Sequence, residues 1–184
     1  MPYQYHFGID PGHKGAIVFL ETGNPVPIIY DMPIKFITRK RTTRYKGEDG
    51  VWRRTKKTMT DPILDITKAA AIFRPFTGKS IHGTIERMAL WGQNEKAGTN
   101  SSDTLLKEYG ELKGMLDILE IPYAEVQSTS WQSYLDKPQT KDGSVRLAKY
   151  FFPEGVFNGP QGGLMDGRAD AALIARFDQE KHGS

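Results

Sequence analysis

Residues 4–12 read QYHFGIDPG and are the most informative stretch for the architecture of the chain. They predict a β-strand that ends at a Pro-Gly turn, with Asp10 where the strand stops. Residues 15–20 (GAIVFL) predict a second strand. Residues 26–30 predict a third, at the edge of the sheet because Pro27 cannot donate a ladder hydrogen bond. Three strands with such short links predict an antiparallel meander.

Beyond the meander, the chain alternates between helices and strands. Asp61-Pro62 predicts the start of a helix, because proline is favoured in a first turn. A strand over residues 80–86 ends at Glu86. Further along, the pattern predicts one more strand over residues 122–126. It also predicts four helices, over residues 102–119, 128–135, 145–152 and 166–179. This order predicts an α/β domain with a mixed five-stranded sheet flanked by helices, which is the order of the RNase H-like fold.

Length and composition restrict the class of protein. A chain of 184 residues suits one domain with a sizeable core, here residues 1–184 with a basic insertion at about 35–60. The absence of cysteine excludes disulfides, thiol nucleophiles and cysteine-type zinc sites. No apolar run is long enough to cross a membrane, and the N-terminal residues do not form a secretory leader. We therefore expect no membrane partner and a cytoplasmic location.

Positive charge is concentrated in one segment. Residues 35–57 carry ten positive and two negative side chains, a net charge of +8, whereas the whole chain is only +3. Such asymmetry indicates a polyanion-binding arm on a mildly acidic body, although a solvated loop would have the same composition. The expected DNA contacts are Arg39, Lys40, Arg41, Arg44, Arg53, Arg54, Lys56 and Lys57. Trp52 could stack on a base or anchor the segment to the core.

Acidic residues mark a candidate metal site. Asp10 and Glu86 both end predicted strands, and Asp166 and Asp170 lie one turn apart at the start of the last helix, on the face that continues into apolar residues. Two carboxylates that face the protein body repel each other, and a divalent cation would reverse that sign. Oxygen ligands suit Mg²⁺ or Mn²⁺ rather than zinc, and two such ions can cleave a phosphodiester. The four histidines show no metal-ligand spacing.

Each acidic residue also has a simpler interpretation. Asp10 alone could be a turn residue, Glu86 a solvated charge at a strand end, and Asp166 a helix cap. The combination, in this order and on these elements, favours a functional site.

The motifs resemble those of RuvC-like Holliday junction resolvases, above all the short phage-type members. The likeness is carried by residues 7–12 (FGIDPG), 84–86 (TIE), 130–131 (SW), 141–153 and 166–175 (DGRADAALIA). It implies an RNase H-like fold, a homodimer, and paired symmetric nicks across four-way or branched DNA by Mg²⁺-dependent hydrolysis. If the chain is phage-encoded, its location is the host-cell cytoplasm.

The resemblance also implies roles for individual residues. Asp10, Glu86 and Asp170 would bind the metal. Several family members carry an acidic residue three positions before the last one, where this chain has Gly167, so Asp166 is the expected fourth ligand. Lys141 would lie near the scissile phosphate. The helix over residues 102–119 would help to form the dimer or would pack in the core, and Trp131 is expected in the core.

Two other functions fit the same fold. The chain could be a flap or replication-intermediate nuclease, or a branched-DNA-binding module without turnover. The intact carboxylate set argues against the binding module, because such a module gains nothing from facing like charges. A likeness of residues 8–12 to the first phosphate loop of actin-like kinases is set aside, because those proteins need two lobes and this chain is too short.

Overall fold

The computed structural model describes residues 2–88, 99–159 and 161–183. Its central element is a five-stranded sheet with the strand order β3-β2-β1-β6-β7. The strands are β1 (Tyr5–Asp10), β2 (Ala16–Glu21), β3 (Ile28–Asp31), β6 (Ile81–Glu86) and β7 (Tyr123–Val126). The first three pair antiparallel, whereas β6 and β7 run parallel to β1. The predicted mixed sheet, its meander and the edge position of the third strand are therefore confirmed.

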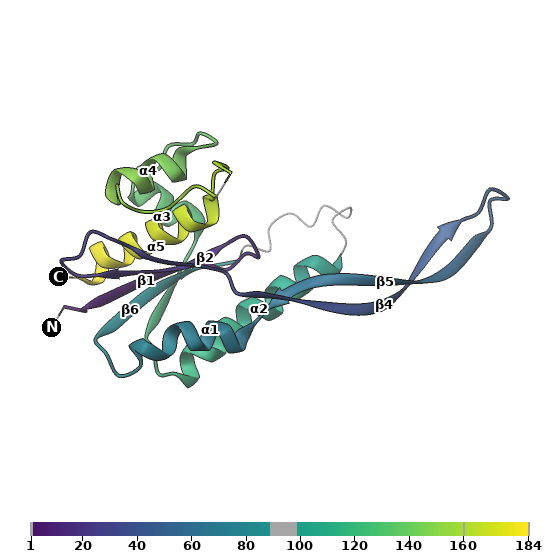
Figure 1. Cartoon of the computed structure of the whole chain (residues 1–184), viewed down its shortest axis with the longest axis horizontal. Helices are drawn as coiled ribbons and strands as arrows, with labels where there is room; N and C mark the ends of the chain where they lie inside the picture. Colours follow the sequence, from purple (N-terminus) through teal and green to yellow (C-terminus); the bar gives the residue numbers. More distant parts are fainter. Residues whose placement is uncertain (1, 89–98, 160, 184) are drawn as a thin grey trace.

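Helices cover both faces of this sheet (Figure 1). One face carries α1 (Ile66–Phe73), continued by the 3₁₀ turn η1 (Arg74–Phe76), and α2 (Thr99–Ile118); the other carries α3 (Ser128–Tyr134), α4 (Gly143–Phe151) and α5 (Asp166–His182). Because side chains alternate along a strand, Ile17 and Phe19 enter one core and Ala16 and Val18 the other. The flanking helices thus bury apolar side chains on both faces of the sheet.

The last helix lies directly on the first strand. Alanines over residues 169–175 keep this side of α5 small, and several of them are fully buried. On the strand side, a Cβ on Gly8 would collide with the backbone of Ala171 and Ala175. Glycine at position 8 therefore permits the close approach that brings the start of α5 to the end of β1.

A long hairpin projects from the body and forms a separate two-stranded sheet (Figure 1). It consists of β4 (Ile34–Lys46) and β5 (Trp52–Leu64), and we call it the arm. The basic segment therefore forms regular structure although it lacks a periodic pattern. Most of the arm's described side chains are exposed to solvent on both faces, so no alternation of apolar and polar residues is required.

The helix start predicted at Asp61-Pro62 is wrong, because both residues belong to β5. Proline is tolerated there since each strand of a two-stranded ribbon is an edge strand. Helix α1 begins instead at Ile66, and the side chain of Asp65 caps it by accepting a hydrogen bond from the backbone N–H of Lys68.

Helix α2 also begins earlier than predicted, at Thr99 rather than at about residue 102. Its later turns pack against the sheet, with Leu112 and Leu116 fully buried. Core packing therefore accounts for one side of this helix. None of the helices within the described residues has the length and apolar character that a membrane span requires.

Candidate active site

Two carboxylates lie side by side where β1 and β6 end. The parallel register pairs Gly8 with Thr84 and Ile9 with Ile85, so Asp10 and Glu86 are the next neighbours. Adjacent strands are about 4.8 Å apart, and side chains two residues apart share a face. Asp10 and Glu86 therefore lie on the face of the sheet that α5 covers.

The third carboxylate comes from α5, which runs antiparallel to β1. Ala171 packs over Gly8 near one end of the strand, and Asp178 bonds to His6 near the other. Asp170 consequently lies at the end of β1 where Asp10 lies, and the charge of Asp170 raises the pKa of both Asp10 and Glu86. The structure thus brings Asp10, Glu86 and Asp170 together.

Asp166 is placed less deeply than predicted. It is the first residue of α5 and its side chain is exposed, whereas Asp170 is partly buried. The prediction that both aspartates face the protein body is therefore wrong for Asp166, because the helix begins at the rim of the site. The capping interpretation fails as well, since Met165 occupies the N-cap position without a side-chain hydrogen bond. The charge of Asp166 nevertheless contributes to the raised pKa of Asp170.

The pKa values of all three carboxyl groups are raised. Burial raises the pKa of Asp10 to about 6, although the backbone N–H of Gly12 opposes the shift by donating to Oδ1 at 3.3 Å. Burial also raises the pKa of Glu86 to about 7, against a hydrogen bond from the indole N–H of Trp131 to Oε2 at 3.0 Å. The pKa of Asp170 is raised by burial too.

The donor set fits a divalent cation that prefers oxygen. Asp170 Oδ1 is buried without a hydrogen-bond partner, and within the described residues only one other buried side-chain atom shares that condition. A buried carboxylate oxygen without a partner is costly, and a metal ion would satisfy it. Asp10, Glu86 and Asp170, with Asp166 at the rim, could hold Mg²⁺ or Mn²⁺.

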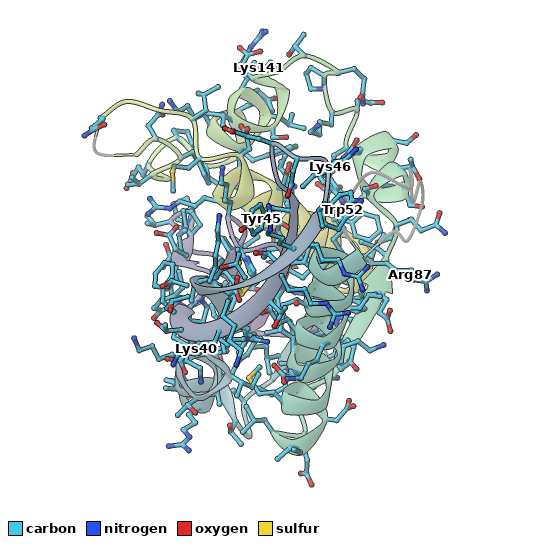
Figure 2. All side chains as sticks on the ribbon, turned by 90° about the vertical axis from the view of Figure 1, so that its right-hand side faces the viewer. Lys40, Tyr45, Lys46, Trp52, Arg87 and Lys141 are labelled. Atoms are coloured by element: carbon cyan, nitrogen blue, oxygen red, sulfur yellow. The ribbon has the colours of Figure 1, made fainter. Side chains whose placement is uncertain are left out.

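Lys137 is a neighbour of the site that the sequence did not indicate. Its positive charge lowers the pKa of both Glu86 and Asp170, and its Nζ lies 6.0 Å from the centre of the Trp131 ring. Lys141 is exposed, and Figure 2 shows it at the outer edge of the body. Of the two lysines, Lys137 is the one that influences these carboxylates.

Glu108 of α2 was also missed, because nothing in the sequence separates it from the solvated glutamates of an ordinary helix. It is buried, and its two oxygens hold two different segments. One accepts a hydrogen bond from the backbone N–H of Leu64 at 3.0 Å, at the root of the arm. The other lies 2.7 Å from Nε2 of His13, in the turn that follows Asp10.

A histidine cluster occupies the opposite end of the same face. Asp178 is buried, and its carboxylate accepts from His6 at 2.7 Å, from His82 at 2.8 Å and from Thr84 at 2.7 Å. His82, Asp178 and His182 place one possible ligand atom each close enough together to hold a metal ion, a grouping that their spacing along the sequence does not reveal. Because both oxygens of Asp178 already accept hydrogen bonds, the cluster is first of all a buried polar network.

The expected DNA-binding residues lie along the arm. They are exposed wherever their side chains are described: Arg39, Lys40 and Arg44 on β4, and Arg53, Arg54, Lys56 and Lys57 on β5. The side chain of Arg41 lies outside the described part of the structure. Trp52 is 67 % exposed at the tip, so it does not anchor the arm to the core.

Comparison with solved structures identifies the fold. A structure of Thermus thermophilus RuvC aligns with a TM-score of 0.51 at 10 % identity, covering 97 % of each chain. A second T. thermophilus RuvC structure, in complex with a Holliday junction substrate, aligns with a TM-score of 0.49 at 11 % identity, covering 94 % of this chain and 91 % of that one. No protein-family model and no curated protein matches the sequence. The sheet order, the flanking helices and this alignment together show that the chain has a RuvC-like form of the RNase H-like fold.

Proposed function

We propose that this chain is a metal-dependent endonuclease that resolves four-way junctions and other branched DNA. The observation that carries the proposal is the meeting of Asp10, Glu86 and Asp170 at one end of the sheet, where burial raises the pKa of all three. Perturbed carboxylates that share a site are typical of metal-dependent catalysis. The RuvC-like fold and the basic arm support the same activity.

The acidic residues would act as metal ligands, with Asp166 completing the set from the rim. Bound Mg²⁺ would supply an activated water and charge stabilisation for phosphodiester hydrolysis, and the set is large enough for two ions. Trp131 holds the Glu86 carboxylate through its indole N–H, and the backbone N–H of Gly12 holds that of Asp10. These bonds orient the ligands before substrate arrives.

Positive charge near the site would receive the DNA backbone. Lys137, whose charge acts on Glu86 and Asp170, would contact a phosphate close to them, and Lys141 would contact a phosphate farther out. The cationic side chains of the arm would bind phosphates of the branches. Paired nicks on a junction with approximate two-fold symmetry need two sites related by that symmetry, so we propose that the protein works as a homodimer. Light scattering of the protein alone and on a junction would test this; a monomer in both states would contradict it.

The central experiment compares labelled four-way, flap and linear duplex DNA, with Mg²⁺, with Mn²⁺ and with EDTA. We expect metal-dependent paired nicks in the four-way junction and none in EDTA. Asp10→Asn should abolish cleavage and leave junction binding intact, because it removes one metal-binding charge and keeps the shape. The matched control is Asp142→Asn, a half-exposed aspartate at the start of α4.

Three outcomes decide between the candidate activities. Preference for the flap over the four-way junction would make the protein a flap nuclease on the same fold. Junction binding without cleavage under any metal condition would make it a binding module. Cleavage by Asp10→Asn at the wild-type rate would contradict the proposal that these carboxylates form the active site.

A further inference from the structure

The arm has two faces that differ in how their positive charges are paired. Residues alternate between faces along each strand, and the register places pairs such as Lys40–Thr58 and Thr42–Lys56 on one of them. We call this the even face, and its cationic and aromatic members are Phe36, Lys40, Arg44, Lys46, Trp52, Arg54 and Lys56. The odd face carries Lys35, Arg39, Tyr45, Arg53 and Lys57 among the described side chains.

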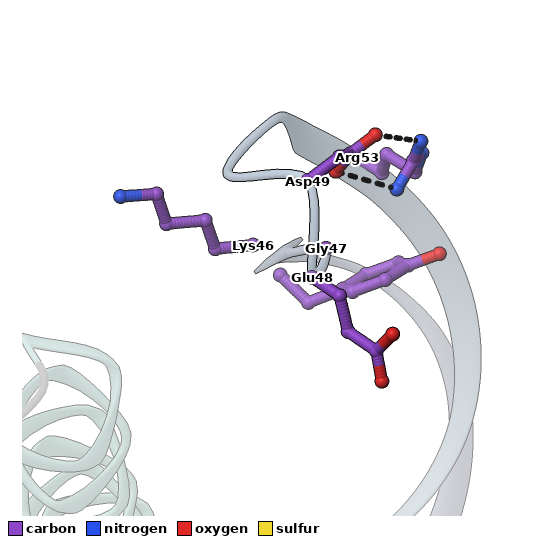
Figure 3. Close-up of a pocket in the computed structure, with 6 residues that line it drawn as sticks. Lys46, Gly47, Glu48, Asp49 and Arg53 are labelled. Carbon is purple, nitrogen blue, oxygen red and sulfur yellow. Dashed lines mark hydrogen bonds and ion pairs between the residues drawn. The ribbon is translucent and has the colours of Figure 1, made fainter.

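Carboxylates neutralise part of the odd face. Arg39 lies 3.8 Å from Asp61, and Arg53 makes a two-pronged contact with Asp49 in the turn. Figure 3 shows that contact at the tip, with Lys46 pointing away from it. Among the ion pairs that the structure describes, none involves a cation of the even face.

The register of the arm places like charges directly opposite each other on both faces, Arg41 with Lys57 on the odd face and Arg44 with Arg54 on the even face. Like charges in that position destabilise a hairpin, and on the even face no described carboxylate offsets the repulsion. A polyanion bound to this face would offset it, so the arrangement favours a phosphate backbone as the partner.

An exposed indole completes the surface. Trp52 pairs with Lys46 in the register, and the two lie next to each other in Figure 2. The indole is 67 % exposed, and it lines a hollow of about 360 Å³ together with Arg44, Arg53 and Arg54. An aromatic ring beside guanidinium groups is a platform on which an unstacked base can lie while the guanidinium groups contact the flanking phosphates.

We infer that the even face of the arm binds branched DNA, with its cations on the phosphates and Trp52 stacked on the exposed face of an unstacked base at the branch point. The inference rests on the proposed DNA-cleaving function, which it makes more specific. Fully paired duplex offers no free base face except at its ends. The arm therefore adds affinity for branched DNA beyond what charge alone supplies.

Two charge-matched triple variants test the sidedness. Lys40→Gln, Arg54→Gln and Lys56→Gln neutralise the even face; Lys35→Gln, Arg39→Gln and Lys57→Gln remove the same charge from the odd face without touching the hollow beside Trp52. Junction binding is measured by fluorescence anisotropy at several salt concentrations, after circular dichroism has shown that both variants are folded. The even-face variant should lower the log–log salt slope by about 2.7, at about 0.9 for each lost phosphate contact. An equal or larger change in the odd-face variant would overturn the inference.

Trp52 is tested separately. Trp52→Ala should weaken binding to a four-way junction by about 5- to 150-fold, the range that corresponds to loss of one stacked base, and should leave linear duplex binding almost unchanged. Trp52→Phe should retain part of the selectivity, because a phenyl ring still stacks. Equal loss on both DNAs, or no loss on the junction, would overturn the stacking role.

The same variants keep this result separate from the proposed cleavage. Their carboxylates are intact, so at DNA concentrations that saturate each variant they should still make metal-dependent nicks. If wild-type protein does not cleave at all, the proposed function fails, and the binding data still decide whether the even face contacts DNA.

Discussion

Arg168 of α5 makes a two-pronged ion pair with Asp31, the last residue of β3, with Nε–Oδ1 and Nη2–Oδ2 distances of 2.5 and 2.7 Å. Arg168 lies between Asp166 and Asp170, and Asp31 lies just before the arm begins at Ile34. The hydrogen bond from Arg168 lowers the pKa of Asp31. One contact therefore joins the acidic start of α5 to the root of the arm.

Arg168→Gln should disturb function more than stability. Asp31 is 52 % exposed, so the pair contributes only about 0.2–1 kcal/mol to the free energy of unfolding. That contribution should be present at neutral pH and lost as pH falls below about 4, because the pKa of Asp31 is lowered in the folded state. Cleavage should fall by about tenfold or more, because the start of α5 positions two of the four carboxylates. Arg176→Gln, which removes an ion pair farther along the same helix, should leave cleavage unchanged. Equal activities of the two variants would show that the Asp31 contact does not position the site.

Asp166→Asn distinguishes two roles for Asp166, that of a metal ligand and that of a charge that only stabilises the helix end. If Asp166 binds the metal, the variant should lose most of its cleavage and need more Mg²⁺ or Mn²⁺ for half-maximal rate. If Asp166 only interacts with the helix dipole, the loss should be confined to stability, at about 0.3–1 kcal/mol. Cleavage rates measured across a metal titration distinguish the two. Normal activity with unchanged metal dependence would reduce the site to Asp10, Glu86 and Asp170.

The metal-free protein should lose stability as pH rises through the range in which its buried carboxylates ionise. The pKa values of Asp10 and Glu86 are raised to about 6 and about 7, so between pH 4 and 7 the folded state binds more protons than the unfolded state. The free energy of unfolding therefore decreases with pH in that window, by about 5 kcal/mol for the two groups together. Urea denaturation in EDTA measures it, with Glu86→Gln as the comparison because it removes the more strongly shifted group. A wild-type curve parallel to that of Glu86→Gln would contradict the prediction.

Lys137→Gln should move the pH dependence of cleavage, and Lys141→Gln should not. Lys137 lowers the pKa of Glu86 and Asp170, so its removal should shift the acid limb of the pH–rate profile to higher pH. Lys141 has no such effect on either carboxylate. Its substitution should at most weaken DNA binding and reduce the salt slope by about one unit. Identical shifts in both variants would show that the effect is one of net charge rather than of position.

Asp178→Ala should be strongly destabilising without touching the carboxylate site. Burial raises the pKa of Asp178, but hydrogen bonds from His6, His82 and Thr84 outweigh it and leave the pKa below its ordinary value. Removing the acceptor leaves these donors without their partner, and His6 is fully buried, so we expect a loss of about 2–5 kcal/mol in urea denaturation. Because the pKa is lowered, the stabilisation should be present above about pH 4 and lost on acidification. A loss below 0.5 kcal/mol would show that water replaces the carboxylate.

The sequence patterns that predicted the structure correctly involve residues close to one another in the chain. Residues 4–12 predict a strand and a turn because alternation of side chains and a Pro-Gly pair act within a few residues of one another. The same locality explains the wrong helix start at Asp61-Pro62. Proline at a first turn and proline in an edge strand look identical in sequence, and the pairing of β5 with β4 decides between them.

The strand ends of Asp10 and Glu86 and the spacing of Asp170 were readable from the sequence, but their assembly depends on contacts over long distances in the chain. Local patterns in the chain were enough to predict the strands of the five-stranded sheet and to indicate which acidic residues could meet. The influence of Lys137 on these carboxylates and the position of Asp166 at the rim depend on how the elements pack together. The hydrogen bond between Asp178 and His6 connects residues 172 positions apart in the chain. Which cations of the arm form ion pairs likewise depends on the register of its two strands. The physical reason is that charge and hydrogen bonding act through space, and only the packing of α5 on β1 and the register of the arm bring those groups within range.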